Sequence, residues 1–178
     1  MVSRAGKIGY PPSMDVQTHA AIEAEWDGDE QAPLGSYAAF IAVYSTAFAG
    51  ALLAARQAGR TLPTPALGDL ALFGVATHKL SRLLAKDKVT AALRAPFTEL
   101  DQDVGPAEVE ERPRGTGPRR AVGELVTCPY CLDQWIAAAF VSGSVFAPRA
   151  TRLTAGVFTA VAIADFLQIA FKAGQKAG

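Results

Sequence analysis

Hydrophobic and polar positions are segregated along this chain. Charged residues crowd into residues 15–30 and 79–120, whereas the ranges 31–55, 134–148 and 153–164 contain no charge. An uncharged apolar stretch of about 18 or more residues is long enough to cross the hydrocarbon core of a bilayer as a helix. Residues 31–55 pass this test, so the pattern predicts a membrane protein.

The same pattern predicts the fold class, an all-α polytopic membrane protein. One membrane domain is expected over residues 34–172, with two helical hairpins joined by a polar cytoplasmic loop at 86–124. The expected transmembrane helices lie at about 35–55, 66–85, 126–147 and 153–171. We find no strand pattern.

The two ends of the chain are expected to be polar tails. Residues 1–33 are acidic, and we expect a poorly ordered cytoplasmic tail that could contain a short helix over Asp15–Glu30. Residues 173–178 are expected to form a short C-terminal tail. A cleaved signal peptide needs a basic segment followed directly by a short apolar stretch, and residues 1–33 lack this arrangement. Export is therefore not expected.

Composition supports the membrane prediction. Half of the 178 residues are hydrophobic and only 19% are charged, whereas soluble domains average about 25%. Small residues at four-residue spacing, Ala47, Gly50, Ala51 and Ala54 in the first helix and Gly156, Ala160 and Ala164 in the fourth, allow close helix approach in lipid. We therefore expect a homo-oligomer or a larger membrane-protein complex, with lipids as further partners and no nucleic acid.

Orientation follows from the distribution of Lys and Arg, which is biased toward the cytoplasmic side of bacterial membranes. Four spans would place four basic residues outside: Arg56, Arg60, Arg149 and Arg152. The other thirteen would lie in the tails, near the central loop or within it. The prediction is a multi-pass protein of the bacterial plasma membrane with both termini in the cytoplasm.

Several polar residues fall within or beside the predicted spans. Lys79, Arg82, Asp133 and Asp165 would form an intramembrane charge cluster near the cytoplasmic boundary. An unpaired carboxylate at membrane depth is costly, so Asp165 is expected to pair with Lys79 or Arg82, or to be protonated. The alternative for the two cations is that they extend to the lipid headgroups from the end of a short helix.

Cys128-Pro129-Tyr130-Cys131 is the motif with the most evident chemistry. Three interpretations stay open: packing at a helix start, thiol redox chemistry, and a zinc site completed by His78 and a carboxylate or a second subunit. A thioredoxin-like fold would require alternating strands and helices around the motif. A stable structural disulfide is not expected, because the predicted orientation exposes the pair to a reducing cytoplasm.

The glycine-rich turn before this motif is a second candidate site. Arg119 and Arg120 follow Gly115-Thr116-Gly117-Pro118, and arginines beside exposed backbone N–H groups can bind an anion or a lipid headgroup. The turn matches no nucleotide-binding signature. A plain linker is the alternative.

Four blocks of sequence together resemble a bacterial family of small integral membrane proteins, the domain of unknown function 1360. The blocks are His78-Lys79-Leu80-Ser81-Arg82, Lys86-Asp87-Lys88-Val89-Thr90, Arg94-Ala95-Pro96-Phe97-Thr98, and Gly123 to Trp135. The resemblance covers roughly Leu67–Phe171 and implies a membrane location without an established activity; some members are associated with sporulation or phage genomes. Positions matching the family motif are Lys79, Arg82, Asp87, Arg94, Pro96, Phe97, Glu124, Cys128, Cys131 and Trp135.

Three functions therefore remain open from the sequence. We expect an accessory or assembly subunit that works through helix packing and its cytoplasmic loop, and no residue set specifies catalysis. The alternative is a membrane-embedded thiol-redox or metal-binding protein that uses Cys128 and Cys131. A weaker alternative is an oligomeric transporter, because four short spans would have to associate to line a pathway.

Overall fold

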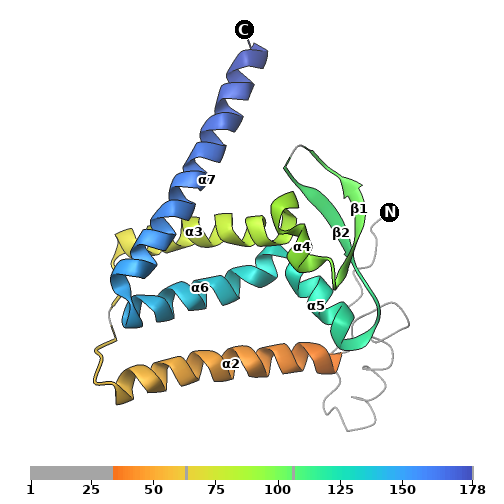
Figure 1. Ribbon diagram of the computed structural model, residues 1–178. Coiled ribbons are helices and arrows are strands. Elements are labelled where there is room, and N and C mark those ends of the chain that lie inside the picture. The colour runs from red at the N-terminus through yellow and green to blue at the C-terminus, as the bar shows by residue number, and fades with distance from the viewer. Residues whose placement is uncertain (1–33, 63, 106, 178) are drawn as a thin grey trace, which may run out of the picture.

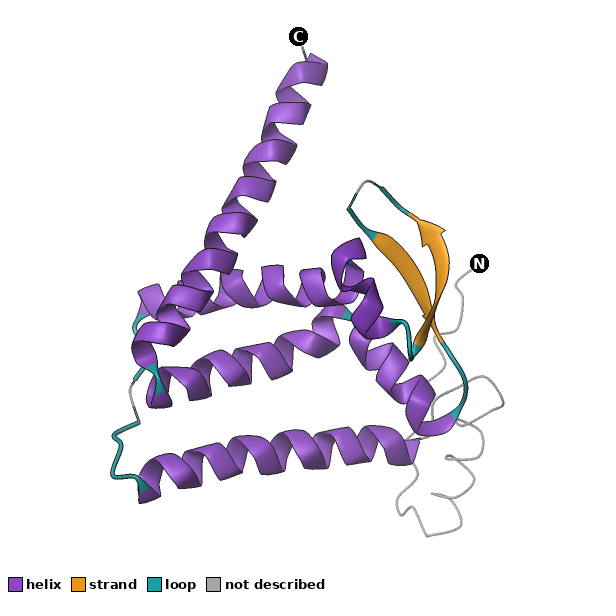
Figure 2. Ribbon diagram, in the orientation of Figure 1, coloured by secondary structure: helices purple, strands orange, loops and turns teal. Residues whose placement is uncertain are grey.

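The computed structural model describes residues 34–62, 64–105 and 107–177, and the predicted tail at 1–33 lies outside them. The described chain is mostly helical, with one two-stranded antiparallel hairpin (Figure 2). Its elements are α2 (Leu34–Gln57), α3 (Leu67–Lys86), the 3₁₀ helix η1 (Lys88–Thr90), α4 (Ala91–Arg94), β1 (Thr98–Asp103), β2 (Val109–Pro113), α5 (Gly117–Thr127), α6 (Pro129–Phe146) and α7 (Pro148–Ala177).

Helices α3, α6 and α7 share the hydrophobic core. Phe73 of α3 stacks on Phe140 of α6 with ring centroids 5.7 Å apart, and Ala155 of α7 is fully buried in the same cluster. Helix α6 approaches α7 closely at Gly143, where an added Cβ would lie 2.7 Å from Thr151 Oγ1. Helix α3 is central because it packs against both of the others.

Helix α2 packs against α6 through a small set of contacts. Tyr44 meets Trp135 edge to face, with ring centroids 5.3 Å apart. Beyond the end of α2, Arg60 donates a hydrogen bond to the Val145 carbonyl oxygen at 3.0 Å. The α2–α3 and α6–α7 connections thus lie at one end of the helices, and the hairpin and α5 lie at the other (Figure 1).

Two of the described helices are long and apolar enough to cross a bilayer: α2, and α7 over Pro148–Lys176. Only 6% and 11% of their most apolar windows are buried, whereas a core helix of a soluble protein would be mostly buried. Helix α7 leans away from the others, and its C-terminal half projects beyond them (Figure 1). Of the four predicted spans, two therefore qualify by length and composition.

The helix boundaries correct two details of the predicted domain. Helix α7 begins at Pro148, which suits a first helical turn, and continues to Ala177, so residues 173–177 are helical and do not form a separate tail. The predicted span at 126–147 is interrupted near its start, because α5 ends at Thr127 and α6 begins at Pro129.

The hairpin corrects the all-α prediction in part: the described chain is mostly helical, but it contains two strands. Strands β1 and β2 pair antiparallel over Thr98–Asp103 and Val109–Pro113. Most β1 side chains are exposed, so the hairpin lacks the apolar alternation that identifies a half-buried strand. The strands are held instead by ion pairs across the hairpin, between Arg112 and Asp101 and between Arg114 and Glu99, with the arginine Nε 3.2 Å from a carboxylate oxygen in each.

Most of residues 86–124 form ordered structure in place of the predicted loop. Helix α5 packs against β2, and the Arg114 N–H donates to the Phe97 carbonyl oxygen at 2.8 Å. Gly123 makes this packing possible, because an added Cβ would lie 2.5 Å from that oxygen and 3.0 Å from Pro113 Cβ. We refer to residues 87–128, from the end of α3 to the start of α6, as the polar module.

Candidate functional site

A cleft of about 600 Å³ lies between α3, α7 and the tip of the hairpin. In Figure 1, α7 and the hairpin rise above α3, near its opposite ends. The charged and titratable residues that line it come from all three elements: His78, Lys79, Arg82 and Asp87 from α3 and its end, Glu108 from the hairpin, and Asp165 and Lys172 from α7. Three motif positions of the sequence resemblance, Lys79, Arg82 and Asp87, therefore share one cleft.

Two ion pairs cross this cleft. Lys79 Nζ lies 2.9 Å from Asp165 Oδ2 and joins α3 to α7. The Arg82 guanidinium donates to both oxygens of Glu108, each at 2.8 Å, and joins α3 to the hairpin. Asp165 thus pairs with Lys79, one of its two expected partners. Arg82 pairs instead with Glu108, a hairpin residue that the sequence pattern does not mark as a site.

Asp87 occupies the corner where α3 ends. Its backbone forms an isolated bridge with Glu108, and the neighbouring Lys88 N–H donates to the Ala107 carbonyl oxygen at 2.8 Å. Burial raises the pKa of the Asp87 carboxyl above its usual range, Lys79 acts against this shift, and Glu108 adds to it. The described chain gives this carboxylate neither a hydrogen bond nor an ion pair.

Arg94 and Glu111 form the most deeply buried ion pair of the described residues, with side chains 2% and 6% exposed. Arg94 Nε donates to Glu111 Oε2 at 2.7 Å, and one of its terminal nitrogens donates to Glu111 Oε1 at 3.1 Å. The remaining N–H groups donate to the Leu84 carbonyl at 2.7 Å, Thr90 Oγ1 at 2.7 Å and the Asp87 carbonyl at 3.1 Å. All five guanidinium donors are thereby satisfied.

The rest of the motif around Arg94 completes this network. The Thr98 hydroxyl lies 3.0 Å from the Arg94 carbonyl oxygen and 3.1 Å from Glu111 Oε2. Arg119 donates to the Pro96 carbonyl oxygen at 2.7 and 3.0 Å. Arg94, Pro96 and Phe97 therefore have structural contacts in the polar module. Arg119 is predicted from the sequence to contact an anion or a lipid headgroup, but in the structure it binds the Pro96 carbonyl oxygen.

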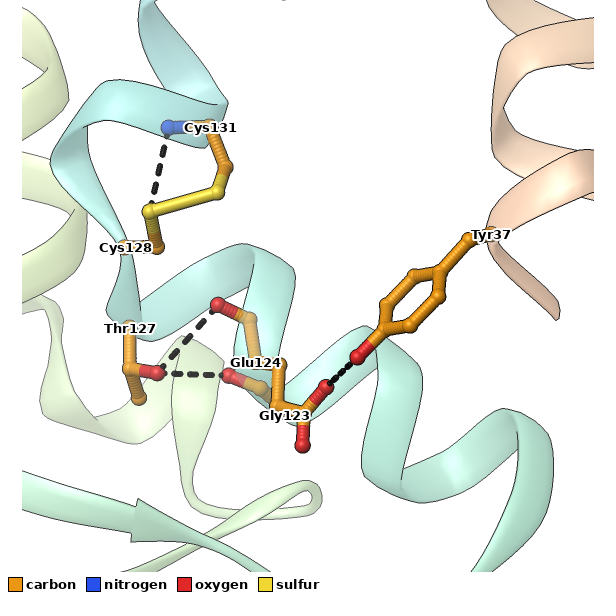
Figure 3. Close-up of a disulfide and its surroundings, with 6 residues drawn as sticks. All are labelled: Tyr37, Gly123, Glu124, Thr127, Cys128 and Cys131. Atoms are coloured by element: carbon orange, nitrogen blue, oxygen red, sulfur yellow. Dashed lines mark hydrogen bonds between the residues drawn. A yellow bond between two sulfur atoms is a disulfide. The ribbon is translucent and has the colours of Figure 1, made fainter. Parts of the chain in front are cut away.

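Cys128 and Cys131 are joined by a disulfide, contrary to expectation (Figure 3). Cys128 caps α6, and the Cys131 N–H donates to its Sγ at 3.2 Å. Their Cα atoms are 5.3 Å apart, inside the range that a disulfide spans. The first turn of α6 therefore brings the two sulfurs together, and this local geometry is independent of the redox state of the compartment.

Glu124, four residues before Cys128, links α5 to α2. Tyr37 of α2 donates a hydrogen bond to Glu124 Oε2 (Figure 3). Arg120 Nε donates to Glu124 Oε1 at 3.1 Å within α5, so the second arginine predicted to contact anions also has an internal partner. Together with the Trp135–Tyr44 contact, Glu124 fixes α2 to the rest of the chain.

His78 and Asp133 make their contacts elsewhere than at the cysteines. His78 stacks on Phe166 of α7 with ring centroids 6.4 Å apart. A second cavity of about 400 Å³ between α3 and α6 is lined by His78, Asp133 and Thr77, among others. Asp133 Oδ1 and Thr77 Oγ1 are buried there without a hydrogen-bond partner, so Asp133 does not join the Lys79–Asp165 pair.

The zinc hypothesis gains no support from this arrangement. Among residues 34–62, 64–105 and 107–177, no group of three or more His, Cys, Asp or Glu side chains is placed to hold a metal ion. Both sulfurs are in the disulfide, and thiolates are the form that binds zinc.

Comparisons with known proteins match the region that holds the cleft, the buried ion pair and the disulfide. A family model described as protein of unknown function (DUF1360) covers residues 72–171, more than half of the chain. The chain belongs to the DUF1360 family. Sporulation protein YjcA of Bacillus subtilis (strain 168) is 31% identical over 86 residues, which make up 47% of this chain and 73% of that protein. No solved structure shows significant similarity.

The DUF1360 match begins within α3, so α2 lies outside it. Arg94 is predicted from the sequence as a family-motif position, but its partner Glu111 is not. Glu108, the partner of Arg82, is not predicted either. The available signal was charge at two-residue spacing, with Glu99 and Asp101 on one side of a turn and Arg112 and Arg114 on the other, which is the period of a strand.

We predict that replacing Arg94 destabilises the whole chain. Arg94→Met leaves the buried Glu111 carboxylate without its cation, and breaking a buried pair in this way costs about 3–5 kcal/mol. For a chain of this size the melting temperature should fall by about 6–20 °C, measured by intrinsic fluorescence of the protein in detergent.

Arg112→Gln is the matched control. Its ion pair with Asp101 has side chains 67% and 43% exposed, and exposed pairs contribute at most about 1 kcal/mol. Equal shifts in melting temperature for the two variants would contradict the structural role of the Arg94–Glu111 pair.

Proposed function

We propose that this protein is a small integral protein of the bacterial plasma membrane that acts as an accessory or assembly subunit. The observation that carries the proposal is the exposure of apolar side chains on α2 and α7. Ile41 and Leu53 of α2 are 68% and 57% exposed, and Phe166 and Phe171 of α7 are 59% and 67% exposed. Apolar surfaces of this extent mark contact with lipid or with another protein.

The proposed topology has four spans, α2, α3, α6 and α7, with both termini in the cytoplasm. It is supported by the excess of Lys and Arg on one side. It is also supported by the arrangement of the helices, because the two short connections lie at one end and the polar module at the other (Figure 1). The polar module would face the cytoplasm, where it can contact partners.

A cysteine at Ala58 tests this topology. In a background with Cys128 and Cys131 replaced by Ser, Ala58→Cys should react with an impermeant thiol reagent on intact cells, because Ala58 lies in an outer connection. Gly178→Cys, at the cytoplasmic end, is the control and should react only after the cells are lysed. Labelling of Gly178→Cys but not Ala58→Cys in intact cells would overturn the orientation.

Association is proposed to use the small-residue edges of α2 and α7. Apart from the neighbouring residues and backbone of its own helix, an added Cβ at Gly50 or Gly156 meets no atom of the described chain within 4 Å, so both positions are open to an external helix. Close backbone approach at such residues favours helix association in lipid.

We predict that Gly50→Leu or Gly156→Leu reduces the size of the complex purified from native membranes. A leucine would separate helices that pack at these positions. The measurement is mass photometry of gently solubilised protein, together with mass spectrometry of co-purifying subunits. Leu53→Ile, which keeps the side-chain volume on α2, is the control. Complexes of unchanged size and composition for both glycine variants would exclude these edges as the association surfaces.

A second candidate function is thiol–disulfide exchange, which the disulfide itself favours. Cys131 is exposed while Cys128 is partly buried. An external thiolate that attacks Cys131 Sγ would form a mixed disulfide and release Cys128 as a thiolate. The Cys131 N–H, 3.2 Å from Cys128 Sγ, would stabilise that charge at the start of α6.

Alkylation of single-cysteine variants against pH tests this candidate. With Cys131→Ser, Cys128 should react with a midpoint below about 8.5, the value for an unperturbed thiol, because α6 begins there and its N–H groups favour a thiolate. With Cys128→Ser, Cys131 is the comparison. A midpoint for Cys128 at or above that of a free thiol would exclude redox chemistry and leave a structural disulfide.

A further inference from the structure

The cleft between α3, α7 and the hairpin contains opposite charges that are not paired with each other. Asp87 lies at its α3 end and Lys172 on its α7 side. Within the described residues, neither side chain has an ion pair or a hydrogen bond. The two charges therefore face a shared space while lying too far apart to form a direct ion pair.

The other charged side chains of the cleft already form ion pairs with each other. Lys79 pairs with Asp165, and Arg82 pairs with Glu108. A purely anionic ligand would be attracted by Lys172 but repelled by Asp87. A purely cationic ligand would be attracted by Asp87 but repelled by Lys172. A ligand with one positive and one negative group matches both unpaired residues.

The Asp87 carboxylate favours a primary ammonium over a quaternary one. A primary ammonium donates N–H hydrogen bonds to a carboxylate, whereas a quaternary ammonium has no N–H group to donate. Asp87 is partly buried, and burial raises the pKa of its carboxyl, so a hydrogen-bonded cation would offset the cost of its charge. Lys172, a compact ammonium on a flexible stem, suits a phosphate.

The walls of the cleft indicate that the ligand is amphiphilic. Beside the charges they carry Val104 from the hairpin and Ala162, Phe166 and Ile169 from α7. Phe166 and Ile169 are 59% and 64% exposed and belong to a helix apolar enough to cross a bilayer. An acyl chain leaving the cleft along α7 would thus remain against apolar surface. The volume of about 600 Å³ is ample for a headgroup.

We propose that this cleft binds the phosphoethanolamine headgroup of a phospholipid, with the ammonium at Asp87 and the phosphate at Lys172. The inference rests on the membrane location proposed above, but not on the identity of any protein partner. It gives the family-motif positions Lys79, Arg82 and Asp87 a common role: the ion pairs join α3 to the other two walls of the cleft, and Asp87 recognises the ligand.

Lipid binding to the purified chain tests the proposal. The detergent-solubilised protein is titrated with dioleoyl phosphatidylethanolamine, phosphatidylcholine or phosphatidylglycerol, and occupancy is read by native mass spectrometry. Phosphatidylethanolamine should bind at least about tenfold more tightly than either of the others, because one charge-assisted hydrogen bond is worth about that factor. Equal binding of phosphatidylcholine or phosphatidylglycerol would overturn the assignment.

Variants locate the site. Asp87→Asn and Lys172→Gln should each reduce the affinity for phosphatidylethanolamine about tenfold, while Lys176→Gln, on the same helix outside the cleft, should not. Lys172 is exposed, so its variant folds even if Asp87→Asn does not. Unchanged affinity in Lys172→Gln would overturn the proposed pose.

Free O-phosphoethanolamine distinguishes a lipid from a soluble ligand. The lipid should bind more tightly than the free compound, because its acyl chains add contacts with α7. Equal affinities would overturn the assignment to a membrane lipid. The readout uses the isolated chain, so failure here is distinct from failure of the assembly function, which is measured on native complexes.

Discussion

The buried ion pair between Arg94 and Glu111 joins the end of α3 to the hairpin. Burying two charges is costly, and they are tolerated only when geometry and further hydrogen bonds are favourable. Arg94 meets this condition because all its donors have acceptors, including the Leu84 and Asp87 carbonyl oxygens at the end of α3. The termination of α3, the turn of α4 and the position of β2 are thus fixed by one side chain.

The cleft depends on the same interaction. Strand β2 carries Glu111 to Arg94 and Glu110 to Lys86, and Glu108, just before the strand, reaches Arg82. These pairs hold the hairpin beside α3, opposite the ion pair that joins α3 to α7. This network of ion pairs therefore shapes the cleft, in which the charges of Asp87 and Lys172 stay without an ion pair among the described residues.

The sequence predicts the long helices well, because apolar length is a local property. Residues 35–55 and 66–85 match α2 and α3 closely. It also predicts the pairing of Asp165 with Lys79, because an isolated carboxylate within a long apolar helix is unfavourable. The hairpin was missed because its strands are held by charge pairs such as Arg114–Glu99. Glu111 looked like one of many exposed carboxylates, and only the fold shows that it is buried. The disulfide depends on the local geometry of the α6 start.

Hydrogen–deuterium exchange of the polar module tests this account most directly. The amides of Lys88 and Arg114, which donate to Ala107 and Phe97 carbonyl oxygens, should exchange slowly in the wild-type protein in detergent. In Glu111→Gln both should become fast together, because the module loses the charge that holds it. Fast exchange of both amides in the wild type, or unchanged slow exchange in the variant, would show that residues 87–128 are not a folded module held by the Arg94–Glu111 pair.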